Sequence, residues 1–113
     1  MHRAFSDCHD NPVYLTEACW FDHILVEHPE MDNEEESVQL TLRDPDFRTR
    51  NPAFPNREIF YRTCQLRLVP NAVVKVVVAF ESTELGFSRG TLITAFPATS
   101  IRQGEDLLWK RNN

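Results

Sequence analysis

The sequence is short of glycine and has no long apolar run. Its three glycines among 113 residues leave no glycine-rich loop to cradle a phosphate. The GxGxxG, Walker and GxSxG motifs are also absent, which argues against nucleotide-dependent chemistry. No stretch approaches the roughly 18 consecutive apolar residues that a membrane span requires, and the opening MHRAFSDCHD holds no apolar signal core. We therefore expect a cytoplasmic protein with no membrane partner.

Cysteine is scarce as well. Cys8, Cys19 and Cys64 form no CxxC pair, and one is left over however two of them pair. This favours reduced thiols in a reducing compartment. Cys19, His23 and Glu27 recur at helical spacing as candidate metal ligands, but three successive turns of one helix spread too far apart to close a tetrahedral site. We expect neither a metal site nor a cofactor.

Basic residues are outnumbered by acidic ones, and the formal net charge is −5 at pH 7. Such a charge repels nucleic acid from the molecule as a whole. The charges are unevenly distributed, however. Glu34, Glu35 and Glu36 form an acidic block, whereas the arginines and Lys75 gather through the middle of the chain. A local basic face is therefore compatible with the sequence.

The length fits one domain. Residues 1–15 show no periodicity and predict an N-terminal arm, free or paired at a sheet edge, ahead of a single domain over residues 16–113. Apolar residues at helical spacing predict a first helix over residues 17–27. A second helix is predicted from Asn33 and the glutamates that follow it to the stop signal at Asp44.

Beyond a proline-rich loop the apolar period changes to two. It predicts strands over residues 57–68, 73–80 and 91–96, with one short extended piece at 47–50. The order of elements predicts an α+β fold in which two N-terminal helices pack on a mostly antiparallel sheet.

Two histidines stand near the end of the first predicted helix. His28 falls on its apolar stripe at the C-terminus, where the helix dipole favours the protonated form. It is a candidate general acid near neutral pH or, alternatively, a histidine that caps a terminal carbonyl. His23 precedes Glu27 by four residues, a spacing that permits an oriented imidazole.

A second set of candidates comes from three successive predicted strands. Arg62, Lys75 and Thr94 supply two cations and a hydroxyl that can meet around a phosphate. Because the sequence does not fix strand register, Arg62 and Lys75 need not share a face. The alternatives are a buried ion pair of Arg62 with Glu27 or Glu58, a solvated edge for Lys75, and a purely strand-forming role for Thr94.

Five segments of the chain follow one another in a distinctive order: TEACWFDHILVEHPEM, LRDPD, IFYRTC, VVKVVVAF and TLITAFPATSIRQGEDLLW. The resemblance that they carry covers roughly residues 16–111, and its most specific parts are HILVEHPE, DPD, the YR pair, and ITAFP with GEDLLW after it. In this order they resemble the phage-associated nuclease-like domains of the barnase, EndoU, colicin and RelE group.

The resemblance implies a RelE- or barnase-like fold, with two N-terminal helices packed on a curved four-stranded sheet. It also implies metal-independent cleavage of RNA, in which the ribose 2′-hydroxyl attacks the adjacent phosphate. The implied catalytic residues are His23 or His28 as base or acid, Arg62 as phosphate clamp and Thr94 as hydrogen-bond donor, with substrate binding by Tyr61 and Lys75. The implied partners are RNA and a cognate inhibitor or antitoxin protein.

The leading hypothesis is therefore a small endoribonuclease of phage or mobile-element type, acting as a toxin or an anti-phage factor. The alternative is a non-catalytic nuclease-like scaffold that binds a protein partner, which the acidic charge favours. A structural subunit of a phage particle is a third hypothesis, suggested only by the phage association.

Overall fold

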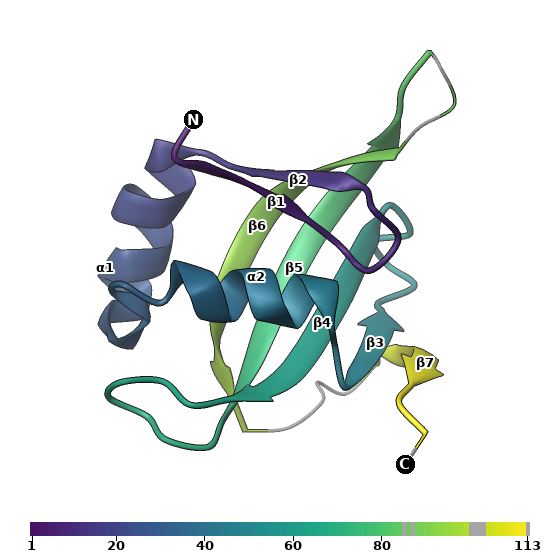
Figure 1. Ribbon diagram of the computed structural model, residues 1–113. Helices are drawn as coiled ribbons and strands as arrows, with labels where there is room; N and C mark the ends of the chain where they lie inside the picture. The colour runs from purple at the N-terminus through teal and green to yellow at the C-terminus, as the bar shows by residue number, and fades with distance from the viewer. Residues whose placement is uncertain (85, 87, 100–103, 113) are drawn as a thin grey trace.

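The computed structural model describes residues 1–84, 86, 88–99 and 104–112, which form one curved sheet with helices on one face (Figure 1). The described strands are β1 (Arg3–Ser6), β2 (Pro12–Leu15), β3 (Phe47–Arg50), β4 (Arg57–Cys64), β5 (Ala72–Ser82), β6 (Ser88–Ala98) and β7 (Asp106–Lys110). Their order in the sheet is β1-β2-β6-β5-β4-β3-β7. Neighbours are antiparallel except β2 and β6, which run parallel.

The helices lie where the sequence predicts them. The first is continuous over two parts, η1 (Ala18–Ile24) with π-type hydrogen bonding and α1 (Leu25–Glu27), followed by a 3₁₀ turn, η2 (Pro29–Met31). The second is α2 (Glu35–Arg43). Pro29 ends the first helix, because the residue before a proline is pushed out of the helical region.

The predicted fold, two helices on a four-stranded RelE- or barnase-like sheet, is wrong. The described residues instead form a seven-stranded mixed sheet with two short helices. The strands predicted at 47–50, 57–68, 73–80 and 91–96 correspond to β3, β4, β5 and β6, but the sequence analysis did not predict β1, β2 or β7. The first two are four residues each, and every residue of β7 is exposed. Neither situation leaves a clear burial period in the sequence.

Residues 1–15, expected as an arm that is free or paired at a sheet edge, form a hairpin of β1 and β2. Its second strand pairs with β6, and the hairpin crosses the helix-bearing side of the sheet (Figure 1). Its turn is held by Asp7, whose Oδ1 accepts hydrogen bonds of 2.9 Å from the backbone N–H groups of His9 and Asn11. The hairpin buries Phe5 and, on β2, Val13. It is therefore part of the core.

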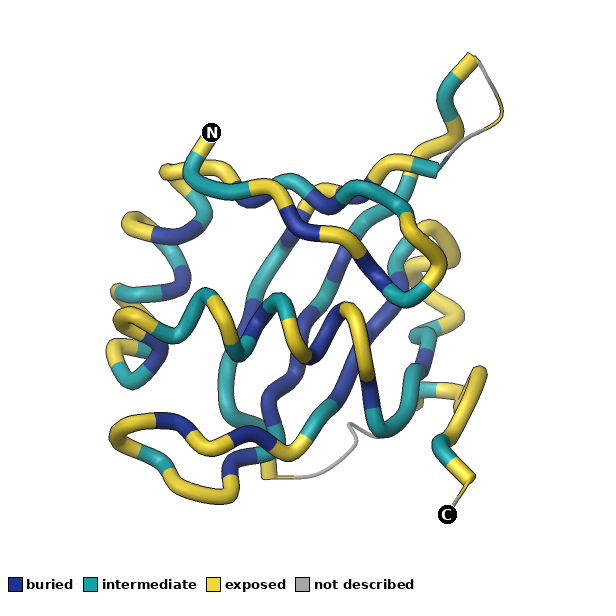
Figure 2. The backbone as a smooth tube through the Cα atoms, in the orientation of Figure 1, coloured by how far each residue is buried: buried dark blue, intermediate teal, exposed yellow. Residues whose placement is uncertain are grey.

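The core lies between the helices and the sheet (Figure 2). We call this side of the sheet the helix face and the opposite side the site face. Alternate residues of β5 point to the helix face, where they are fully buried against the inner side of α2 and of the first helix. Fully buried residues of this core include Trp20, Ile24, Val38, Leu42, Phe60, Val74, Val76 and Val78.

Gly90 lets the hairpin approach β6, because its missing side chain leaves room for Val13 and Val78. A methyl group at this position would come within 2.6 Å of Cγ1 of Val78. We expect Gly90→Ala to lower the free energy of unfolding by about 1–3 kcal/mol, as overpacking does. Urea denaturation would measure this, with Ser88→Ala on the same strand as a control. Equal stability of Gly90→Ala and wild type would show that the strands can separate at no cost.

Candidate functional site

The site face carries a row of large side chains at one level of the sheet. Tyr61 of β4 is the register partner of Lys75 in β5, which in turn is the partner of Phe96 in β6. Phe47 of β3 stacks on Tyr61, with ring centroids 4.6 Å apart. The Nζ of Lys75 lies 5.6 Å from the Tyr61 ring centroid and 5.8 Å from that of Phe96. Aromatic faces at these distances attract the ammonium group.

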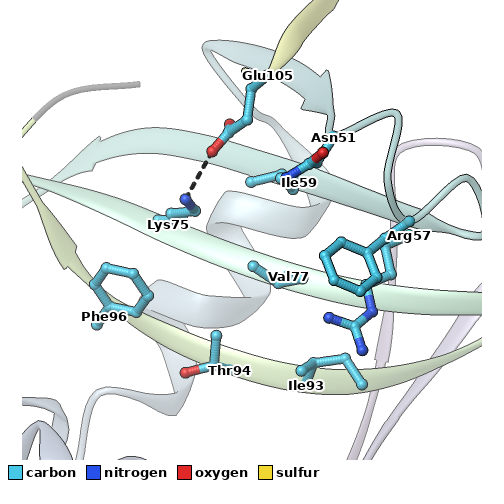
Figure 3. Close-up of a pocket in the computed structure, with 10 residues that line it drawn as sticks. Asn51, Arg57, Ile59, Lys75, Val77, Ile93, Thr94, Phe96 and Glu105 are labelled. Carbon is cyan, nitrogen blue, oxygen red and sulfur yellow. Dashed lines mark hydrogen bonds and ion pairs between the residues drawn. The ribbon is translucent and has the colours of Figure 1, made fainter. Parts of the chain in front are cut away.

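A buried carboxylate, Glu105, covers this row from the segment before β7 (Figure 3). Its side chain is only 1% exposed. Lys75 Nζ donates a 2.8 Å hydrogen bond to its Oε2. Tyr61 Oη and Thr49 Oγ1 donate to Oε1 over 2.6 and 2.5 Å. Both oxygens therefore have partners, which a buried charge needs.

The electrostatics of the pair keep Glu105 ionised. Burial alone would raise the pKa of Glu105, but hydrogen bonds from Lys75, Thr49 and Tyr61, together with the positive charge of Lys75, lower that pKa below its ordinary value. Because its pKa is low, this carboxylate is a weak base. The arrangement suits Glu105 to holding Lys75 and Tyr61 in position.

We expect this carboxylate to make stability pH-dependent in acid. Its pKa is lower in the folded than in the unfolded protein, so its contribution is complete above the unfolded pKa and disappears as the pH falls through the folded pKa. Glu105→Gln has no carboxylate to titrate. Measured by urea denaturation between about pH 7 and about pH 3, the wild type should lose stability more steeply than Glu105→Gln. Parallel curves for the two proteins would contradict the expectation.

His28 reaches the row from the end of the first helix. Its ring stacks on Phe96, with centroids 4.7 Å apart and planes inclined by 16°. Its Nδ1 lies 3.7 Å from a carboxylate oxygen of Glu30, and the side chain is 27% exposed. Phe96 therefore separates His28 from Lys75 by one aromatic ring, and part of the imidazole stays accessible to solvent.

A cavity of about 180 Å³ opens on the site face beside this row. Thr94, the register partner of Val77, lines it next to Lys75 and Phe96 (Figure 3). The row and the cavity together bring three predicted site residues to the site face, Tyr61, Lys75 and Thr94. A fourth, His28, is joined to them by its ring contact with Phe96.

Arg62 lies elsewhere. It follows Tyr61 in β4 and is paired with Val74, so its side chain points to the helix face. Its Nη1 donates to the backbone oxygen of Asp44 over 2.6 Å and to Oδ2 of the same residue over 3.2 Å. Its ion pairs are thus with Asp44 and, over 3.8 Å, with Asp46, and not with the glutamates considered from the sequence. Arg62 and Lys75 cannot meet around one phosphate.

His23 lies on the first helix with its Nδ1 3.7 Å from Glu27, the partner that the spacing predicts. It is one turn beyond Cys19, whose thiol donates to the backbone oxygen of Leu92 in β6. His23 is therefore placed toward the edge of β6, but without the ring contact that ties His28 to the row.

Sequence reasoning missed Glu105 and the role of Phe96. Glu105 follows the last predicted strand, in a segment without periodicity. The GEDLLW stretch that contains it was noted for the resemblance, but the glutamate was given no role. Phe96 was counted only as a strand residue. The one usable signal was the parity of β6, which places Thr94 and Phe96 on the same face.

The three cysteine thiols are not activated as nucleophiles. Burial raises the pKa values of Cys8, Cys19 and Cys64, so these thiols are protonated at neutral pH. Among the described residues, no group of three or more His, Cys, Asp or Glu side chains is placed to hold a metal ion, and no helix has the length and apolar character to cross a membrane.

Comparisons of the chain with protein-family models, with curated protein sequences and with solved structures gave no match.

Proposed function

We propose that this protein is a metal-independent endoribonuclease of the cytoplasm. The observation that supports the proposal is that Lys75, Thr94 and Phe96 line one cavity while His28 stacks on the ring of Phe96. An imidazole, a cation and a hydroxyl donor supply proton transfer and charge stabilisation for attack of a ribose 2′-hydroxyl on the adjacent phosphate.

Each group has a defined role in the proposed reaction. The 2′-oxygen forms a bond to phosphorus, the bond to the 5′-oxygen breaks, and a 2′,3′-cyclic phosphate results. His28 takes the proton from the 2′-hydroxyl and then gives it to the departing 5′-oxygen. Lys75 stabilises the charge that develops on the phosphate, and Thr94 donates a hydrogen bond to it. Glu105 is a positioning residue that holds Lys75 and Tyr61.

The biological setting is proposed on the resemblance alone. A phage or mobile-element toxin, or a defence factor, would be accompanied by a cognate inhibitor protein. That inhibitor would have to cover the site face to block RNA.

The test is cleavage of a defined single-stranded RNA in excess EDTA. We expect the protein to cut the RNA under these conditions and to leave a 2′,3′-cyclic phosphate end. A matched oligonucleotide with 2′-deoxyribose at the cleaved position should remain intact, because it lacks the attacking hydroxyl. Cleavage of both substrates at the same rate would overturn the proposed chemistry.

A non-catalytic nuclease-like scaffold is the second candidate, and one observation favours it. The charge of Lys75 is already matched by Glu105 within a buried pair, and the chain carries a net charge of −5. Such a site suits a basic protein partner better than RNA. A folded wild-type protein that leaves RNA uncut would favour this function.

A further inference from the structure

We infer that the end of the cavity away from Lys75 binds a nucleobase of single-stranded RNA, an inference that rests on the proposed function. Arg57 lies at this end, with Ile59 and Val77 beside it as an apolar surface (Figure 3). Phe54 lines the same cavity, and its ring lies under the Arg57 guanidinium. A base has flat apolar faces and polar edges. The cavity offers an aromatic ring and an apolar surface for the faces of a base, and a hydrogen-bond donor for its edge.

The segment that carries Phe54, residues 51–56, is fixed by backbone hydrogen bonds. The Phe54 N–H donates to the carbonyl of Asn51 over 2.9 Å, and the Arg57 N–H donates to that of Phe54 over 3.0 Å. The carbonyl of Asn56 accepts a 2.8 Å bond from a backbone N–H of β5. An aromatic side chain on a preorganised segment loses little conformational entropy on binding.

Phe54 and Arg57 are available to a ligand. The Phe54 side chain is 46% exposed although it is large and apolar. The Arg57 guanidinium lies 4.4 Å from its ring centroid and makes no hydrogen bond or ion pair with any residue that the structure describes. Its five N–H donors can therefore bind acceptors on a base edge. Proteins read unpaired bases by stacking on aromatic and guanidinium planes in this way.

The position of this end of the cavity relative to Lys75 favours RNA as the ligand. One cavity joins Phe54 and Arg57 to Lys75 and Thr94. A phosphate beside Lys75 and a base beside Phe54 can then belong to neighbouring parts of one strand. Stacking is open only to an unpaired base, which excludes duplex RNA as the ligand.

The test is equilibrium binding of a short, fluorescently labelled 2′-O-methyl RNA, measured by anisotropy at fixed salt. This probe cannot be cleaved through its 2′-oxygen, so binding is measured whether or not the protein is a nuclease. We expect Phe54→Ala to weaken binding about tenfold or more and Phe54→Trp to retain it. The matched control is Leu68→Ala, at another exposed apolar residue outside the cavity.

The outcomes separate this inference from the proposed function. If binding depends on Phe54 but the wild type leaves RNA uncut, the proposed nuclease function is overturned and the proposed base-binding site is supported. Equal affinity for an abasic version of the probe would overturn the base site, because only the backbone would then be bound. No binding by the wild type, or equal losses in Phe54→Ala and Leu68→Ala, would overturn it as well.

Discussion

Lys75→Met should lower the free energy of unfolding by about 3–5 kcal/mol, the range seen when one member of a buried ion pair is removed. Lys75 is 7% exposed, and methionine has nearly the same shape, so little packing is lost. The loss comes from the Glu105 carboxylate, which stays buried without its cation. In a domain of this size, such a loss is a large part of the total stability.

The double variant Lys75→Met, Glu105→Gln identifies the cause. Because it leaves no unpaired charge buried, it should recover much of the stability that Lys75→Met loses. Urea denaturation of the wild type, both single variants and the double variant provides the cycle. Lys110→Met, at an exposed lysine of β7, is the control and should change stability by less than about 0.5 kcal/mol. A double variant no more stable than Lys75→Met would show that the buried charge is not the cause.

His28→Ala should reduce RNA cleavage by about 100-fold or more, the usual loss when a general acid or base is removed. The side chain is partly exposed and packs on Phe96 through one ring face, so the thermal stability should change little. Initial cleavage rates in excess EDTA, beside thermal unfolding of the same preparations, measure both effects.

The matched control is His9→Ala. His9 is exposed and lies in the turn between β1 and β2, and it does not line the cavity beside Lys75. Its replacement should leave the cleavage rate unchanged. A folded His28→Ala protein that cuts RNA as fast as His9→Ala would remove His28 from the mechanism and move the search to His23.

Local patterns identified the elements whose burial alternates over many residues. β5 is the clearest case, since its buried valines recur at every second position over a long strand. The hairpin carries the same alternation in Phe5 and Val13, but over strands of four residues that give too few repeats to recognise. β7 has no alternation at all, because it is an exposed edge strand held by pairing with β3. Pairing through backbone hydrogen bonds imposes no pattern of apolar and polar side chains on such a strand.

The candidate site divides in the same way. Histidine, lysine and threonine were recognisable by their chemistry. Simple alternation along β6 would put Thr94 on one face with Leu92, but a β-bulge between these two residues leaves Leu92 in the core and Thr94 at the cavity. Whether Arg62 or Lys75 belongs to that face depends on strand pairing, since adjacent strands can slip by one residue and exchange faces. The register that pairs Tyr61 with Lys75 and Arg62 with Val74 settles it.

The helices, the long central strands and the chemical types of the candidate residues could be predicted from the sequence, because each depends on neighbours within a few positions along the chain. Three features required the folded chain: residues 1–15 complete the sheet, Arg62 pairs with Asp44, and Glu105 closes over Lys75. Glu105 and Lys75 are 30 positions apart. Contacts of that separation follow from how strands pair and how the chain crosses a face, and no local period encodes them.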